Sequence, residues 1–306
     1  MDRDEALQGL VDKGVLTPDQ ADAVRDALRD ETAGTPKWLG EAAGYVGGVL
    51  MLGGAGILMA TQWDAMTRTG RAASLGGITL ALLLVAGFLA IGGRTPIRRR
   101  VAGVLVAIAS GTAALTAGVI AERWEGTAAG LTGLAVATIG YAVLRNIPPL
   151  LAMGANSIVA AAGVAADGWS SSELAMTLVF LAVGAAWFAL AFAGVLRPVP
   201  VAFGIGGTIA IIGGQIGLTI EDAPWWGYGS TFAVALLCFA VYAVRRTPVL
   251  LVGGVVGVAL AAPEAVWSWT DGAAGGAVIL LVAGAALIGA SALSFRLARL
   301  GKTRTA

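Results

Sequence analysis

Long uninterrupted runs of apolar residues constrain this chain more than any other feature of its sequence. A run of about 20 such residues forms a helix long enough to cross the hydrocarbon core of a bilayer. Apolar residues make up 57% of the 306 residues and charged residues only 13%, whereas a typical soluble domain is about a quarter charged. The chain is therefore expected to be an all-α polytopic integral membrane protein.

Ten apolar blocks predict about ten transmembrane helices, arranged as five hairpins within a membrane domain of residues 39–294. A basic cytoplasmic tail, 295–306, follows the last block. The expected spans are 39–61, 72–92, 101–121, 127–144, 148–166, 174–196, 200–220, 229–244, 248–266 and 274–294.

The connections between these blocks alternate in charge. The loops that follow the even-numbered spans contain arginine and no acid, as in "GRTPIRRR" and "RRTP". Each loop after an odd-numbered span contains an acid and a tryptophan, as in "ERWEG", "EDAPWWGYG" and "EAVWSWTDG". Lysine and arginine near span ends stay on the cytoplasmic side of a membrane. Both termini are therefore predicted to be cytoplasmic, with the acidic, tryptophan-rich loops facing outward.

Proline and tryptophan mark the two ends of each predicted hairpin. Pro96, Pro148, Pro198 and Pro248 recur at nearly equal intervals and open spans on the basic side, where proline costs the helix no hydrogen bond. Bilayer thickness alone imposes part of this period, so a duplicated hairpin and a simple geometric repeat both remain open. Tryptophans of the outer turns are expected to anchor the helices at the interface: Trp63, Trp124, Trp169, Trp225, Trp226, Trp267 and Trp269.

The first 33 residues differ from the rest because they are polar and charged. Two short amphipathic helices are predicted, the first from Asp2 to Asp12 with Gly14 as its stop. The second begins at "TPDQ", where Thr17 and Gln20 have the spacing of a capping box. Residues 1–33 are therefore expected to form a cytoplasmic helical hairpin, which residues 34–38 link to the membrane domain. The hairpin covers its own chain or docks a partner.

Three polar residues at membrane depth are the candidate functional positions. Asn156 is predicted near the middle of the fifth span and Gln215 in the outer half of the seventh. Glu41 lies in the first turn of the first span, where the helix dipole favours a carboxylate. Each could stabilise helix packing by hydrogen bonding or line a polar pathway. No acid is expected at mid-depth, so a relay of buried carboxylates has no obvious carrier.

Composition argues against several classes of activity. The chain contains no histidine, which removes the usual general base and the commonest metal ligand. One cysteine, Cys238, makes neither an intrachain disulfide nor a thiolate metal site. The net charge of +1 provides no basic surface for nucleic acid. We therefore expect no cofactor, no metal site and no nucleic-acid partner, and the bilayer is the predicted environment.

The amino-terminal third of the sequence resembles a known family. "GVLTPDQADAV", followed by "WLGEAAGYVGGVLMLGGAGILMATQWDAM" and the basic "RTGR", is similar to the DUF2157 family of predicted bacterial membrane proteins. The resemblance covers roughly residues 5–95. It implies a polytopic protein of the bacterial inner membrane and assigns no activity and no catalytic residues.

Three functions remain open from the sequence. A small-molecule transporter or channel would place a polar cavity around Asn156 and Gln215. A non-enzymatic scaffold or sensor would dock a cytoplasmic partner through residues 1–33. An enzyme acting on lipid-linked substrates would use the outer acids Glu122, Glu125, Glu221 and Asp222, but no recognisable motif accompanies them. Transport is the leading prediction, scaffolding the alternative, and an enzyme the least favoured.

Overall fold

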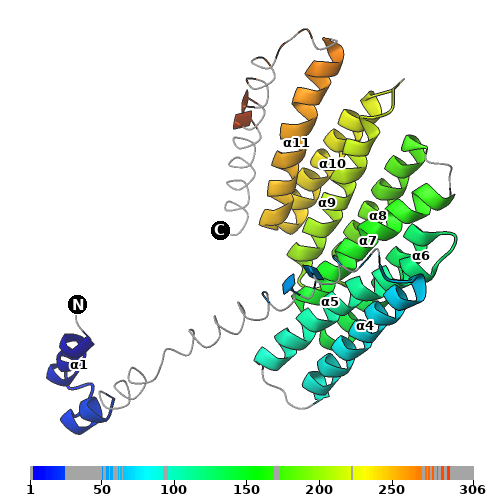
Figure 1. Cartoon of the computed structure of the whole chain (residues 1–306). Coiled ribbons are helices and arrows are strands. Elements are labelled where there is room, and N and C mark those ends of the chain that lie inside the picture. Colours follow the sequence, from blue (N-terminus) through cyan, green and yellow to red (C-terminus); the bar gives the residue numbers. More distant parts are fainter. Residues whose placement is uncertain are drawn as a thin grey trace. The chain divides into compact units, whose positions relative to one another are not determined.

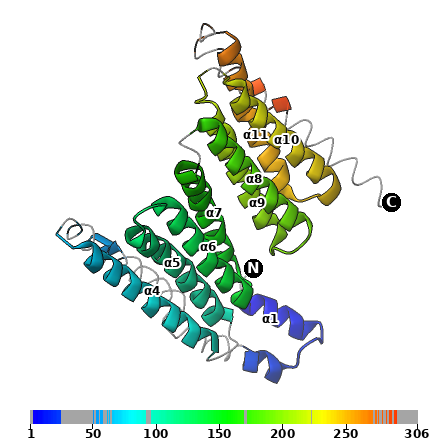
Figure 2. The same cartoon turned by 90° about the vertical axis from the view of Figure 1, so that its right-hand side faces the viewer.

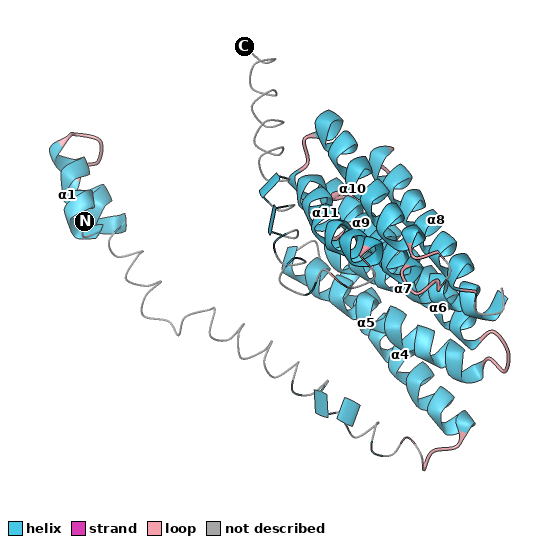
Figure 3. Ribbon diagram, turned by 90° about the horizontal axis from the view of Figure 1, so that it is seen from above, coloured by secondary structure: helices cyan, strands magenta, loops and turns pink. Residues whose placement is uncertain are grey.

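A computed structural model of the chain describes residues 3–24, 65–91, 96–168, 172–221 and 223–270, with scattered residues between 50 and 63 and between 273 and 289. The chain divides into two compact units, Met1–Met66 and Thr67–Ala306, and each is described here by itself. Throughout the described residues the regular structure is helical, as Figures 1 and 3 show. The all-α class predicted from the sequence is confirmed.

The described part of the first unit is a helical hairpin. Helix α1 (Arg3–Asp12) is followed by Gly14 at φ 67°, and a second helix occupies residues 18–24. The backbone N–H of Thr17 donates to Oε1 of Gln20 at 3.0 Å, and the N–H of Gln20 donates to Oγ1 of Thr17 at 3.3 Å. These reciprocal bonds are a capping box, so this local prediction is confirmed.

Among its described residues, the second unit contains eight helices that are long and apolar enough to cross a membrane. They agree with eight of the predicted spans. The other two, 39–61 and 274–294, lie largely outside the described residues, as do the linker 34–38 and the tail 295–306. The eight are α4 (Arg68–Ile91), α5 (Pro96–Ile120), α6 (Glu125–Leu144), α7 (Ile147–Gly168), α8 (Glu173–Phe192), α9 (Val199–Gly217), α10 (Trp225–Arg245) and α11 (Pro248–Trp269).

These helices form two halves with the same internal arrangement, α4–α7 and α8–α11 (Figure 2). Within each half, consecutive helices pack side by side, and the second helix also contacts the fourth. The halves meet where α7 packs against α8 and α9. Each half therefore consists of two hairpins rather than one.

The two halves also match in sequence. "YAVLR" ends α6 and "YAVRR" ends α10. Arg145 and Arg246 occupy the left-handed region at φ 47° and 53°, and each donates its N–H to the carbonyl of the tyrosine that opens its motif. In the helices that follow, three buried positions recur at matching places: Leu150 and Leu250, Gly154 and Gly254, and Ala161 and Ala261.

Glycine permits close contact between neighbouring helices. Where α6 crosses α7, a Cβ added to Gly126 would lie 2.9 Å from Cα of Gly163, which is shorter than real carbon contacts. Where α8 crosses α9, a Cβ on Gly184 would lie 2.8 Å from that of Ala210. In a bilayer, where apolar surface gains nothing by leaving lipid, this close backbone approach provides much of the packing energy.

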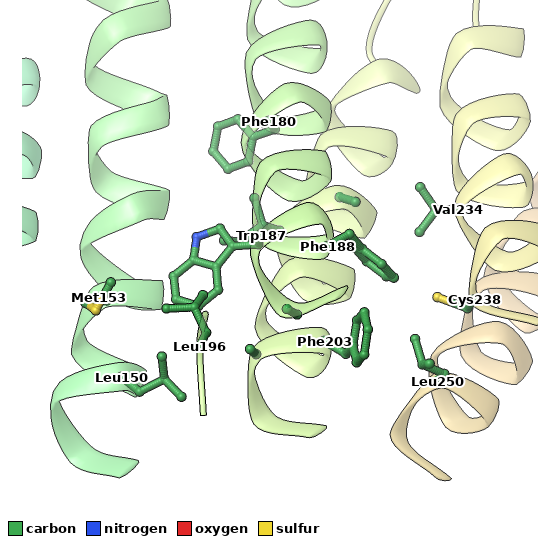
Figure 4. Packing of buried hydrophobic residues seen from close by; sticks show 14 of the residues in the cluster. Leu150, Met153, Phe180, Trp187, Phe188, Leu196, Phe203, Val234, Cys238 and Leu250 are labelled. Carbon is green, nitrogen blue, oxygen red and sulfur yellow. The ribbon is translucent and has the colours of Figure 1, made fainter. Parts of the chain in front are cut away.

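The core extends across the boundary between the halves. Figure 4 shows Trp187 of α8 extending toward Met153 of α7, and Phe188 facing Phe203 of α9. The two phenylalanine rings are tilted, with centroids 5.5 Å apart. Cys238 lies in the same cluster and is 2% exposed. It behaves as the small buried apolar residue expected from the sequence.

Candidate functional site

The second unit has two chemically distinct ends. We call the end that holds Arg145, Arg197 and Arg246 the arginine end, and the end that holds the loops 121–124 and 218–224 the tryptophan end. At the tryptophan end, Trp124, Trp225, Trp267 and Trp269 are all more than half exposed. Exposed indoles at a helix end suit an interfacial layer.

The predicted tryptophan anchors occupy several environments. The rings of Trp225 and Trp226 stack with centroids 4.9 Å apart. Trp269 donates its indole N–H to the hydroxyl of Tyr228 at 3.3 Å. Trp63 is half-buried, and Trp169 lies outside the described residues, as does Glu41. Helix α11 continues to Trp269, so Trp267 and Trp269 lie in its last turn rather than in a loop, which corrects the boundary predicted at residue 266.

Arginine side chains cap the carboxyl ends of neighbouring helices at both ends of the unit. Arg68 donates to the carbonyls of Val119, Ile120 and Ala121 at 2.7, 3.1 and 2.7 Å. It also lies 3.6 Å from the carboxylate of Glu122. This arginine is one of the few bases on the acidic side, and its local partners explain its presence there.

Two further arginines repeat this arrangement at the arginine end. Arg99 donates to the carbonyl of Leu144 at 3.3 Å, and Arg245 donates to that of Phe192 at 2.6 Å while stacking on its ring. Each basic side chain therefore satisfies carbonyls that a helix end leaves without partners.

Asn156 lies at the centre of a buried hydrogen-bond cluster. Its side-chain N–H groups donate to Oγ of Ser110 on α5 at 3.2 Å and to the carbonyl of Ala152 at 2.8 Å. Its Oδ1 lies against Gly133 of α6, so that an added Cβ would overlap it. Asn156 is 6% exposed and Ser110 is fully buried. The amide thus joins three helices, and among the described residues its bonds are those of a packing contact.

A second interhelical bond lies beside it. Ser157 donates to the carbonyl of Met153 at 2.8 Å and accepts the indole N–H of Trp187 at 3.2 Å. Because Trp187 belongs to α8, this bond joins the two halves of the unit. A tyrosine makes another such link: Tyr141 of α6 accepts the N–H of Arg197 and donates to its carbonyl at 2.6 and 3.0 Å.

Gln215 contacts different helices from Asn156 and lies at a different depth. It is near the end of α9, and its side chain faces Glu264 of α11. Nε2 of Gln215 is buried and makes no hydrogen bond. The structure therefore does not bring Asn156 and Gln215 together at one cavity.

The sequence prediction overlooked Glu264. It was grouped with the outer loop "EAVWSWTDG", but α11 extends past it by about one and a half turns. Its Oε2 is buried and, like Nε2 of Gln215, makes no hydrogen bond. A carboxylate inside a membrane helix is costly and marks a functional position by default. The span predicted at 248–266 already contained Glu264, but the residue was counted with the acids of the outer loop.

An apolar groove of about 460 Å³ lies between the halves. Gly154, Ala155 and Ile158 line it from α7, and Gly204 and Ile205 line it from α9. Its glycines are themselves covered by neighbouring side chains, since Ile205 packs on Gly154 and Val249 packs on Gly204. Its volume falls within the range of pockets that hold small molecules.

Two of the predicted outer acids have structural surroundings, whereas Glu221 is an exposed turn residue. Glu122 pairs with Arg68, and Glu125 lies in the first turn of α6, where the helix dipole stabilises a carboxylate. Asp167 accepts the N–H and the hydroxyl of Thr127 at 3.0 and 2.8 Å and so caps the same helix. Asp222 lies outside the described residues.

Comparison of the chain with models of protein families, with curated proteins and with solved structures finds no match. The resemblance to the DUF2157 family therefore stays a prediction. Without this resemblance the supported result is coarser: the described part of the chain is helical and has eight helices able to cross a membrane.

Proposed function

We propose that this multi-pass membrane protein is a transporter for a small, largely apolar molecule that passes along the interface between its two halves. The observation that carries the proposal is the groove between α7 and α9 at the boundary of two halves with matching packing and sequence. Transporters built from repeats place their substrate at the repeat interface and work by moving one repeat against the other.

The chemistry of the lining supports an apolar substrate. The described groove residues are aliphatic, glycine or alanine, with Pro200 and Thr208 beside them. The hydroxyl of Thr208 already donates to the carbonyl of Gly204 at 2.9 Å. A polar or charged substrate would find no partner among these side chains and would lose its hydration without compensation.

The test uses thiol accessibility, because the substrate is not identified. The chain has a single cysteine, so Cys238→Ala gives a background without thiols. Ile158→Cys and Ile205→Cys then place one thiol each in the groove. A pathway that opens to water would let a charged, membrane-impermeant methanethiosulfonate reagent modify both positions in liposomes.

Two further cysteine positions, one on the apolar surface and one outside the helices, serve as controls for thiol accessibility. Leu236 on α10 is 52% exposed on the apolar surface and does not line the groove, so Leu236→Cys should remain unmodified. Glu221→Cys, outside the helices, should react fully. Modification of Glu221→Cys alone would mean that water does not enter between the halves, and the transport proposal would then fail.

We also propose that the arginine end faces the cytoplasm of a bacterial cell and the tryptophan end faces outward. The asymmetry of lysine and arginine supports this orientation. The described bases at the tryptophan end include Arg68, which is held by backbone carbonyls and Glu122. We propose no enzymatic activity, because the described outer acids Glu122 and Glu125 already serve helix packing and capping.

A second candidate function, a scaffold that docks a cytoplasmic partner through residues 1–33, is favoured by one observation. The capped hairpin leaves three apolar side chains substantially exposed, Val15 at 65% and Leu10 and Val24 at 39% each. Removal of residues 2–33 should then abolish co-purification of a partner with the membrane domain. Thr17→Ala, which removes one half of the capping box, should weaken it. An unchanged set of co-purifying proteins would exclude this role.

A further inference from the structure

Glu264 has no basic residue available to neutralise it in its own half of the unit. Arg197 precedes α9, and Arg245 and Arg246 end α10, so all three lie at the arginine end. The next base in the sequence is Arg296. Helix α11 packs on α9 and α10, whereas the arginines at the tryptophan end belong to the other half. Among the residues that the structure describes, this carboxylate within a span thus faces an amide and no cation.

The two halves differ at this very turn. In the first half, Gly163 of α7 packs directly on Gly126 of α6. In the second half the corresponding turn of α11 contains Pro263 and Glu264, and Gly227, the match of Gly126, packs instead on Leu218 at the end of α9. At this turn the second half therefore has a carboxylate where the first half has a glycine contact, and its own close glycine contact lies between Gly217 of α9 and Gly227 of α10.

Further oxygen atoms are available near the pair. Pro263 has no N–H, so the carbonyl of Ala259, in the turn below Glu264, loses its usual helical donor. Broken hydrogen bonding of this kind supplies carbonyl ligands to ions in membrane transporters. The other titratable groups described toward this end of α9–α11 are Glu221 and the hydroxyl of Tyr228, and neither is a base.

We propose that Glu264 and Gln215 form a binding site for a small alkali cation at the tryptophan end between α9 and α11. The carboxylate of Glu264 neutralises the charge, and the amide of Gln215, turned so that its oxygen faces the carboxylate, supplies a second oxygen. Oε2 of Glu264 is buried beside the Gln215 amide without a hydrogen bond to it, and it is the ligand position. The site goes beyond the transport proposal and stands whether or not the groove takes a substrate.

Carbodiimide labelling tests the site in the full chain. Dicyclohexylcarbodiimide enters the bilayer and modifies carboxyl groups that lie in an apolar environment. In liposomes with choline chloride, wild-type protein should be labelled at Glu264, as located by mass spectrometry of its peptides. Replacing choline by sodium should reduce this labelling several-fold. The pH is held constant between the two salts, because carbodiimide reacts with the protonated carboxyl and raised pH would lower the labelling of any carboxyl group.

Three variants separate a binding role from a packing role. Glu264→Gln should lose the label, whereas Glu173→Gln, which changes an exposed acid at the start of α8, should keep it. Gln215→Leu retains the carboxyl, so it should still be labelled but lose most of the protection by the cation. If Glu264→Gln does not fold, the wild type and Gln215→Leu still test the site.

Two results would overturn the proposal: no label on Glu264 under any condition, or a label that sodium does not reduce. Neither result bears on thiol reactivity in the groove, so failure of the cation site and failure of the transport pathway are distinguishable.

Discussion

At the scale of single residues, the polar groups inside the bundle fall into two kinds. Asn156, Ser157 and Ser110 each make at least one hydrogen bond within or between helices. Gln215 and Glu264 each retain a buried atom without a partner, as do the hydroxyls of Thr177 and Thr231. Satisfied groups hold helices together, whereas an unsatisfied ionisable group in a membrane span, here Glu264, marks a candidate functional position.

We predict that Asn156→Ala and Ser110→Ala each destabilise the protein by about 0.6–2 kcal/mol. The double variant should cost less than the sum, because both substitutions remove the same bond. Unfolding in bicelles measures the free energies. The control is Thr138→Ala, since Thr138 bonds only the carbonyl of its own helix and is exposed. Strict additivity would show that the bond contributes nothing.

Glycine contacts lead to a second residue-scale prediction. Gly163→Ala should destabilise the α6–α7 contact by about 1–3 kcal/mol, because its Cβ would overlap the backbone of α6. Gly111→Ala meets no atom within 4 Å and should be neutral or stabilising by up to about 1 kcal/mol. Thermal unfolding of both variants in the same detergent measures the difference. Equal effects would contradict the close packing described for α6 and α7.

At the scale of helices, arginine capping connects segments that are distant in sequence. Arg68 at the start of α4 holds the end of α5, and Arg245 at the end of α10 holds the end of α8. These bonds fix the position of one helix along the axis of its neighbour. Apolar contacts with lipid and with other helices do not specify this axial position.

We predict that Arg68→Leu lowers the free energy of unfolding by about 1–3 kcal/mol, since it removes charged donors from three carbonyls. Arg68→Lys should recover part of this loss, because an ammonium cannot reproduce the guanidinium fork. Glu122→Gln should change stability by less than about 1 kcal/mol, because its carboxylate is largely exposed. If Glu122→Gln matched Arg68→Leu, the ion pair rather than the carbonyl bonds would dominate.

The sequence predicted helices far better than it predicted the site. Apolar length located all eight described spans, and local rules located the Thr17–Gln20 capping box, because both depend on neighbouring residues. Which residues meet across helices depends on rotation about each axis, which an almost uniformly apolar helix does not encode. Asn156 and Gln215 therefore looked like members of one site, and Glu264 was counted with the acids of an outer loop.

At the scale of the whole molecule, the second unit is asymmetric from end to end. Tryptophans and acids gather at one end and most arginines at the other. The unit can therefore cross a membrane in two orientations, which differ in the end that faces the cytoplasm. In a background of Cys238→Ala, Glu221→Cys should react with an impermeant maleimide added to intact cells. Thr247→Cys, which precedes α11 at the arginine end, should react only after permeabilisation. The reverse pattern would invert the proposed topology.

The fluorescence of one buried tryptophan can report on the contact between the two halves. Trp187 is 5% exposed and donates its indole N–H to Ser157 across the boundary between the halves. An indole in such a dry, fixed environment emits at short wavelength. In a variant that keeps Trp187 and replaces the other tryptophans by phenylalanine, separation of the halves would expose the ring and shift its emission to the red. The protein thus contains an intrinsic fluorophore at the surface along which its halves would have to part.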